Sequence, residues 1–159
     1  MEVLRPETRM TTLATLREEE ESEGAVDGGV VMMNLNLQPG HCVEVKGFIP
    51  PDSKWFSINL GKNASTILIH FNARFDHQGD IQKIVCNSLE ENAWGTEQRE
   101  DFFPFQQGSE TTVCFEYQAD KINIKLPSGE EFAFPVRMEL PDVSFLSLAG
   151  IQFKSITYE

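Results

Sequence analysis

From Val30 onward, the chain alternates apolar and polar residues over short stretches that are separated by turn-forming residues. In residues 121–126, for example, Ile122, Ile124 and Leu126 alternate with Lys and Asn, and Pro-Ser-Gly then turns the chain. Side chains two apart on a strand share one face, so this period of two predicts half-buried β-strands. Eleven strands are expected, at residues 30–37, 42–49, 54–60, 65–75, 81–87, 96–101, 111–117, 121–126, 130–135, 143–148 and 151–158.

Many short strands at close spacing, without amphipathic helices between them, are typical of two antiparallel sheets packed face to face. We therefore expect an all-β fold, a two-sheet antiparallel β-sandwich. No internal repeat of about 20–50 residues is visible, so the pattern favours neither a solenoid nor a propeller.

The first 27 residues differ from the rest in composition. They hold eight of the 25 acidic residues, including the run EEEESE at 18–23, but only three of the 13 basic ones. Such a segment buries little apolar surface, so we expect residues 1–27 to be a disordered acidic extension with at most a marginal helix near 10–22. Residues 28–159 are expected to form the folded domain.

Composition narrows the class of protein further. With 159 residues, 40% of them hydrophobic and 12 of them Phe, the chain can build one domain with a real core. No apolar run approaches the roughly 20 residues of a membrane-spanning helix, and no secretory signal peptide is readable. The net charge of −12 disfavours nucleic acid and anionic membrane surfaces as partners.

Three cysteines, Cys42, Cys86 and Cys114, are too few and too widely spaced for a metal cluster. We expect them to be reduced thiols, with inert packing favoured over a redox role. No metal or cofactor is expected.

The stretch TILIHFNARF contains candidate binding chemistry. His70, Asn72 and Arg74 lie two apart and share one face of the expected strand, while Ile69 and Phe71 face the other way. A solvated outer face is the ordinary explanation of such a polar row. The residues downstream favour a binding site instead.

Trp94 lies beside a turn glycine and close in sequence to Asn87, Glu97 and Arg99. A pyranose has a patch of C–H groups that packs on an indole and hydroxyls that need both donors and acceptors. We therefore expect a sugar site, organised before binding by an ion network of Arg74, Glu97 and Arg99.

Three segments in order, HFNAR at 70–74, VCN at 85–87 and WGTEQR at 94–99, resemble the carbohydrate-recognition sequence of the galectins, H-x-N-P-R, V-x-N and W-G-x-E-x-R. The resemblance covers residues 28–159. It implies a jelly-roll sandwich of the galectin and legume-lectin type. It also implies a prototype, single-domain, non-enzymatic lectin that binds β-galactosides such as lactose and N-acetyllactosamine.

The resemblance also implies roles for seven carbohydrate-binding residues: His70, Asn72, Arg74, Asn87, Trp94, Glu97 and Arg99. The first three would bind the axial 4-hydroxyl of galactose, and Asn87 and Glu97 the 6-hydroxyl. Trp94 would stack on the sugar, while Arg74, Glu97 and Arg99 would reach the neighbouring ring.

Three positions near the row qualify this picture. Ala73 replaces the usual family proline, which restores a backbone N–H and predicts a lower affinity. Gln78 stands where relatives often carry histidine, so a preference among longer glycans does not carry over. For His77, a solvated position in the loop is favoured over a contact with the sugar.

Family resemblance further implies a homodimer built from strands near 30–37 and 151–158. Val30, Val31, Ile151 and Phe153 are its candidate contacts, with the sandwich core an equally good role for them. The implied partners are β-galactoside-bearing glycoproteins and glycolipids, and the implied locations are the cytoplasm and the cell exterior, reached without a signal peptide.

Two other functions compete with sugar binding. A glycosidase is the first, because Glu97, Glu100 and Asp101 offer carboxylates near the expected sugar site. Such an enzyme needs a carboxylic acid placed as a proton donor, and Glu97 among arginines is unsuited to that role. A galectin-fold protein that acts through protein contacts, with weak or no sugar binding, is the second alternative.

Overall fold

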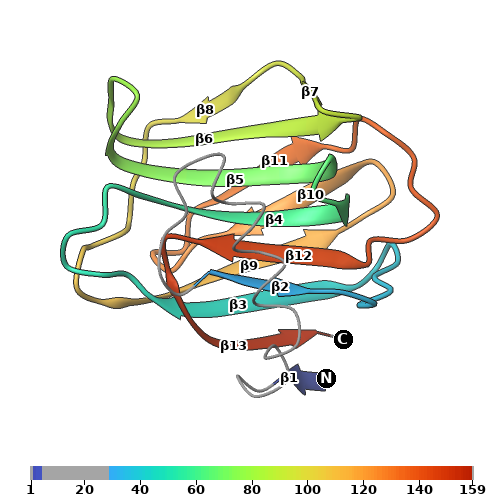
Figure 1. The fold of residues 1–159 in the computed structure, drawn as a ribbon, viewed down its shortest axis with the longest axis horizontal. Coiled ribbons are helices and arrows are strands. Elements are labelled where there is room, and N and C mark those ends of the chain that lie inside the picture. Colours follow the sequence, from blue (N-terminus) through green and yellow to red (C-terminus); the bar gives the residue numbers. More distant parts are fainter. Residues whose placement is uncertain (1, 5–28, 159) are drawn as a thin grey trace.

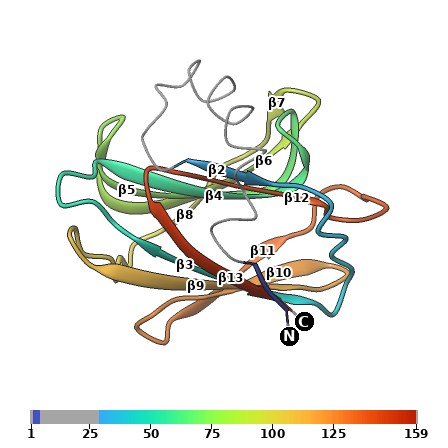
Figure 2. The same cartoon turned by 60° about the horizontal axis from the view of Figure 1, so that its bottom comes forward.

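The computed structural model describes residues 2–4 and 29–158, and in this part of the chain the regular elements are β-strands. Figures 1 and 2 show them as two stacked antiparallel sheets, as predicted. The six-stranded sheet runs, in spatial order, β1 (Glu2–Leu4), β13 (Gln152–Tyr158), β3 (Cys42–Phe48), β9 (Glu110–Tyr117), β10 (Lys121–Lys125) and β11 (Glu131–Pro135).

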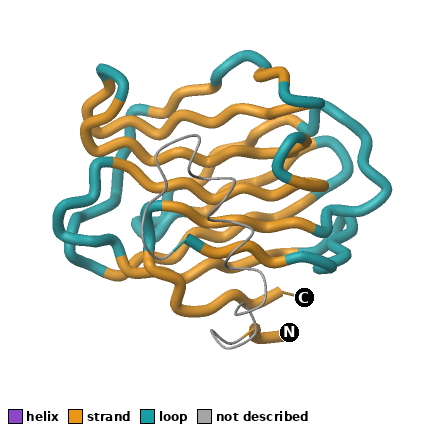
Figure 3. The backbone as a smooth tube through the Cα atoms, in the orientation of Figure 1, coloured by secondary structure: helices purple, strands orange, loops and turns teal. Residues whose placement is uncertain are grey.

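The second sheet carries the polar row. Its strands are, in spatial order, β2 (Val30–Met32), β12 (Phe145–Ala149), β4 (Trp55–Asn63), β5 (Thr66–His77), β6 (Asp80–Glu90) and β7 (Ala93–Trp94), with β8 (Gln98–Glu100) also pairing with β6. Figure 3 shows how loops join these strands at the two ends of the sandwich.

Each of the eleven expected strands has a counterpart, with differences at the ends. The strand expected at 30–37 stops at Met32, because Asn34 and Asn36 take positive φ angles of 64° and 54° that a strand does not accommodate. The two-residue strand β7 was not predicted. Neither was β1, which lies inside the expected extension and pairs antiparallel with β13. The marginal helix expected near 10–22 lies outside the described residues.

The core lies between the sheets and is centred on aromatic rings. Phe71 on β5 is fully buried and contacts Phe56, Phe105 and Phe115, with ring centroids 6.3, 6.1 and 5.8 Å away. The contacts with Phe105 and Phe115 are edge-to-face, an arrangement that stabilises the core beyond the burial of apolar area. The inward face of β5 therefore packs in the core, while the outward face of the same strand carries the polar row.

The candidate dimer contacts, Val30, Val31, Ile151 and Phe153, are all buried within the single chain. Their burial favours the sandwich core, the second of the two roles that the sequence left open.

The three cysteines are free thiols. Cys86 on β6 is buried in the core, and burial raises its pKa well above the usual value. Cys42 on β3 and Cys114 on β9 are half-buried, with their Sγ atoms 3.0 Å apart. Burial raises the pKa of Cys114 to about 12.

In the described part of the chain there is no helix long and apolar enough to cross a membrane. Residues 2–4 and 29–158 also contain no group of three or more His, Cys, Asp or Glu side chains that could hold a metal ion.

Candidate carbohydrate-binding site

The polar row on β5 is held by its own hydrogen bonds. Asn72 donates from Nδ2 to the carbonyl oxygen of Phe56 over 3.1 Å, and Arg74 donates from Nε to Oδ1 of Asn72 over 2.7 Å. Asn72 and Arg74 are only 4% and 7% exposed. The row is therefore not the solvated outer face that the ordinary explanation predicts, and its donors are fixed in direction.

His70 belongs to a polar chain that crosses three strands. Its Nδ1 lies 2.6 Å from Oδ1 of Asn59 on β4, and Nδ2 of Asn59 donates to Oγ of Ser147 on β12 over 3.0 Å. Burial, reinforced by the charge of Arg74, lowers the pKa of His70 from 6.5 to about 4. The imidazole is thus neutral at physiological pH, and with Nδ1–H bound to Asn59 its Nε2 is a hydrogen-bond acceptor.

Trp94 on β7 is an exposed aromatic ring beside this row. Its side chain is 48% exposed, and its ring centroid lies 5.1 Å from that of His70 with a tilt of 58°. This large apolar side chain is exposed to solvent and lies next to buried polar groups. It forms a flat surface for a ligand that has both C–H and hydroxyl groups.

Asn87 on β6 is fixed from both sides. Its Nδ2 donates to the carbonyl oxygen of Gly95 over 3.0 Å, while its Oδ1 accepts from the backbone N–H of Ser88 over 2.8 Å and from Arg137 over 3.1 Å. Glycine at residue 95 leaves room for this contact, since a Cβ atom there would lie 2.9 Å from Nη1 of Arg137 and the guanidinium would have to shift.

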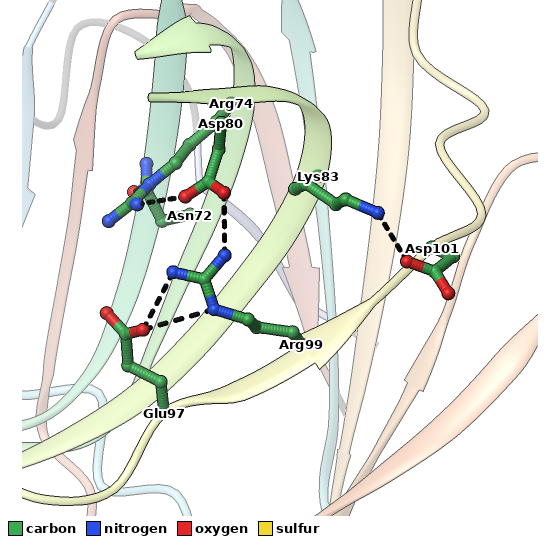
Figure 4. Close-up of polar contacts among 7 residues, drawn as sticks. All are labelled: Asn72, Arg74, Asp80, Lys83, Glu97, Arg99 and Asp101. Atoms are coloured by element: carbon green, nitrogen blue, oxygen red, sulfur yellow. Dashed lines mark hydrogen bonds and ion pairs between the residues drawn. The ribbon is translucent and has the colours of Figure 1, made fainter. Parts of the chain in front are cut away.

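The predicted ion network exists but has one more member. It runs from Arg74 through Asp80 to Arg99 and on to Glu97, with N–O distances of 2.7, 2.7 and 2.9 Å (Figure 4). Hydrogen bonds from Arg99 and Arg74 lower the pKa of Asp80. The expected link between Arg74 and Glu97 is therefore indirect.

A tight turn explains why Asp80 reaches the row. His77 and Asp80 pair across a two-residue hairpin in which Gln78 and Gly79 have φ angles of 51° and 82°. Two successive positive φ angles are typical of the type I′ turn. Since Gln-Gly is a weaker signal for this turn than Asn-Gly, the sequence did not reveal the pairing.

These residues surround a groove of about 600 Å³ on the outer face of the second sheet. Its lining residues are Trp55, His70, Asn72, Arg74, His77, Gln78, Val85, Asn87, Trp94, Gly95 and Glu97. Six of the seven predicted site residues are among them. Arg99 is not in the lining but holds Glu97 and Asp80.

The sequence did not identify Trp55, Asn59, Asp80 or Arg137 as part of this region. Trp55 lies in the groove wall, with its ring 5.5 Å from that of His77. His77 is thus at the groove edge and not only in a solvated loop, and burial followed by the charge of Arg74 lowers its pKa.

Comparison with known proteins agrees with this geometry. The family model for galactoside-binding lectins matches residues 29–158. Galectin-1 of Rhinella arenarum is 66% identical over 131 residues, which cover 82% of this chain and 98% of that protein. Galectin-1 of Sus scrofa is 48% identical over 132 residues, again covering 82% and 98%.

Solved structures give the same result. The complex of toad ovary galectin with thio-digalactose matches with a TM-score of 0.82 and 64% identity, covering 84% of this chain and 100% of that one. CG-16, a homodimeric agglutinin from chicken liver, matches with a TM-score of 0.79 and 42% identity, covering 82% and 99%.

The fold and the groove thus define a β-sandwich of the lectin class. The chain belongs to the galactoside-binding lectins, the galectins, and is of their prototype, single-domain kind.

Proposed function

We propose that the groove binds β-galactosides through His70, Asn72, Arg74, Asn87, Trp94, Glu97 and Arg99, in the roles that the family resemblance implies. The observation that carries the proposal is the exposed indole of Trp94 beside a row of buried, hydrogen-bonded polar groups. Such preorganised groups lose little entropy on binding.

The axial 4-hydroxyl of galactose suits the hydrogen-bonding groups of the row. A hydroxyl donates once and accepts twice. Neutral His70 offers an acceptor, while Arg74 and Asn72 offer donors. In glucose the 4-hydroxyl is equatorial and points away, so these groups stay unpaired at a cost of about 1–3 kcal/mol. The difference gives the groove its preference for galactosides.

A second sugar ring would lie against the ion network. Arg99 and Glu97 are each a little over 40% exposed and present charged hydrogen-bonding groups to solvent. Lactose and N-acetyllactosamine carry hydroxyls on the ring next to galactose, and charge-assisted hydrogen bonds to these are stronger than neutral ones. The proposed ligand is therefore a disaccharide or a longer glycan that ends in it.

Binding without hydrolysis is the proposed activity. Glycoside hydrolysis needs a protonated carboxylic acid on the scissile oxygen. At the groove, Glu97 pairs with Arg99, and Asp80 pairs with two arginines that lower its pKa. Both carboxylates thus accept hydrogen bonds from arginine side chains. Incubation with lactose should release no free galactose.

We further propose a homodimer that cross-links glycoproteins and glycolipids. The chicken relative CG-16 is homodimeric, and two sites on one particle raise avidity without new contacts. The family also supports cytoplasmic and extracellular pools, and the free thiols agree with synthesis in a reducing compartment. Sedimentation that detects only monomer at micromolar concentration would contradict the dimer.

Retention on immobilised lactose tests the binding proposal. The full chain should bind and should elute with lactose but not with sucrose. Trp94→Ala should flow through, because it removes the stacking surface, while Ile81→Ala should bind normally, because Ile81 is 61% exposed and does not line the groove. If the wild type flowed through, the function based on protein contacts would be favoured.

The domain boundary is part of the same proposal. The relatives match over 131–132 residues, and the family model begins at residue 29, so we infer that residues 28–159 are the binding unit and 1–27 an added extension. A glycan array that compares the full chain with a chain starting at Gly28 measures glycan binding with and without the extension. Equal profiles are expected, and loss of all binding by the shorter chain would contradict the boundary.

A further inference from the structure

Arg137 lies outside the sequence motifs and outside the groove lining. It follows β11, a strand of the opposite sheet, and its Cζ atom lies 4.6 Å from the ring centroid of Phe134. Its Nη1 donates to Oδ1 of Asn87 and to Oγ of Ser88, each over 3.1 Å. A residue that follows a strand of the six-stranded sheet thus reaches the amide of a groove residue on the other sheet.

These contacts fix the direction of the Asn87 amide. A guanidinium and a backbone N–H can only donate, so the atom that faces Arg137 and the N–H of Ser88 must be the amide oxygen. The carbonyl of Gly95 can only accept, so the atom that faces it must be the amide nitrogen. Each neighbour gives the same assignment, which excludes a flipped amide.

The nitrogen of Asn87 therefore has one hydrogen to spare. Nδ2 carries two hydrogens and donates one to Gly95, which leaves the second for the groove that Asn87 lines. The charge of Arg137 also polarises the amide, which strengthens this donor.

We propose that Arg137 is a positioning residue of the sugar site, which holds the Asn87 amide so that it offers an N–H to the 6-substituent of galactose. The proposal rests on the proposed function, since it takes the galactose pose from there. It adds a selectivity rule: the 6-substituent must accept a hydrogen bond from Asn87. A 6-hydroxyl can do so while donating to Glu97, whereas a hydrogen or an ammonium group at this position cannot accept.

The sequence favours this long-range contact through Gly95. A Cβ atom at residue 95 would meet Nη1 of Arg137 at 2.9 Å and Oγ of Ser88 at 3.0 Å, closer than such contacts normally come. Glycine at residue 95 therefore leaves room for the guanidinium to approach Asn87.

The test is a cycle of two ligands and three variants measured by calorimetry on the full chain. The ligands are lactose and its analogue in which hydrogen replaces the galactose 6-hydroxyl. The variants are Arg137→Met, which keeps an apolar contact with Phe134, Arg137→Lys, which keeps the charge, and Lys62→Met, a matched loss of charge at an exposed residue of β4.

We expect Arg137→Met to weaken lactose binding about five- to tenfold, equivalent to about 1–1.4 kcal/mol, and binding of the deoxy analogue less than about twofold. Arg137→Lys should recover part of the loss, and Lys62→Met should bind both ligands as the wild type does. Circular dichroism checks that each variant is folded.

Equal losses on both ligands would mean that Arg137 only supports the loop, and no loss on either would mean that it has no role. Both outcomes overturn the positioning role while the lectin assignment stands. Failure of the wild type to bind lactose at all would overturn the proposed function as well, so the two failures are distinguishable.

Discussion

Acidification provides a quantitative test of the role assigned to His70. The proposed site uses neutral His70 as an acceptor for the 4-hydroxyl, so protonation removes that acceptor and weakens binding. Burial and the charge of Arg74 lower the pKa of His70 to about 4, compared with 6.5 for an ordinary histidine. Lactose binding should therefore persist well below the pH at which an unperturbed histidine becomes charged.

The difference between the two cases is large. At pH 5, a group with a pKa of about 4 is roughly 90% neutral, whereas one with a pKa of about 6.5 is roughly 3% neutral. If only neutral His70 supports binding, the lactose Kd should rise by about 10% between pH 7.5 and pH 5 in the first case and by roughly 30-fold in the second. Half of the affinity should be lost near pH 4.

Calorimetric titration with lactose at steps between pH 7.5 and pH 4 measures this dependence. The Cε1–H resonance of His70, one of three histidines, reports its protonation directly. The variant His77→Gln removes the second titrating group at the groove, whose pKa is also lowered. A midpoint near pH 6.5 that persists in this variant would refute the acceptor role or the burial argument behind it.

The same shift predicts how stability depends on pH. The unfolded chain protonates His70 near pH 6.5 and the folded chain near pH 4, so in this interval the unfolded state binds more protons. Stability contributed by neutral His70 is therefore complete above pH 6.5 and is lost as the pH falls towards 4. Asp80, whose pKa is also lowered, acts in the same direction at lower pH. The urea midpoint should be lower at pH 5 than at pH 7, and an unchanged midpoint would count against the shift.

Other substitutions test separate parts of the structure. Asp80→Asn should weaken lactose binding, measured by calorimetry, about tenfold, because it releases two arginines. The control Asp101→Asn breaks a separate ion pair with lysine and should leave lactose binding unchanged. Equal effects of the two substitutions would contradict the role of the ion network. Phe71→Ala should lower the free energy of unfolding in urea by about 3–5 kcal/mol, and a loss under about 1 kcal/mol would contradict its place in the core. Oxidised glutathione should join Cys42 to Cys114 in a disulfide by thiol–disulfide exchange. Mass spectrometry detects the product as a loss of about two hydrogens. The reaction should be slow at neutral pH, because the pKa of Cys114 is about 12. Replacing either cysteine by serine should abolish that product, and its persistence would exclude this pair.

Most strands of the sandwich could be predicted from the sequence, because the alternation of apolar and polar residues that identifies a strand lies within the strand itself. Alternation along 121–126 and along the row at 70–74 specifies which side chains share a face, and the structure confirms both patterns. Where local conformation departs from a strand, the prediction was wrong at the boundary. The positive φ angles at Asn34 and Asn36 end β2 early, and a residue pattern of period two does not contain that signal.

The supporting residues of the site could not be predicted in the same way. Asp80 reaches Arg74 only because the hairpin after His77 pairs the two strands in one particular register. Asn59 meets His70 because the two face each other across β4 and β5. Arg137 follows β11, a strand of the opposite sheet. Each contact depends on strand register or sheet packing, which a single strand's sequence does not encode.

Ala73 shows how far hydrogen bonding can replace a covalent restraint. It stands in the HFNAR motif where the family pattern has proline, and the loss of that ring frees the local φ angle. Yet Asn72 donates a hydrogen bond to the carbonyl of Phe56, and Arg74 donates one to Asn72. Ala73 itself is buried on β5, which pairs with β4 and β6. The direction of the donors therefore depends on the side chain of Asn72 more than it would in a proline-containing relative. Removing that amide would cost the ligand both its own contact and the alignment of Arg74.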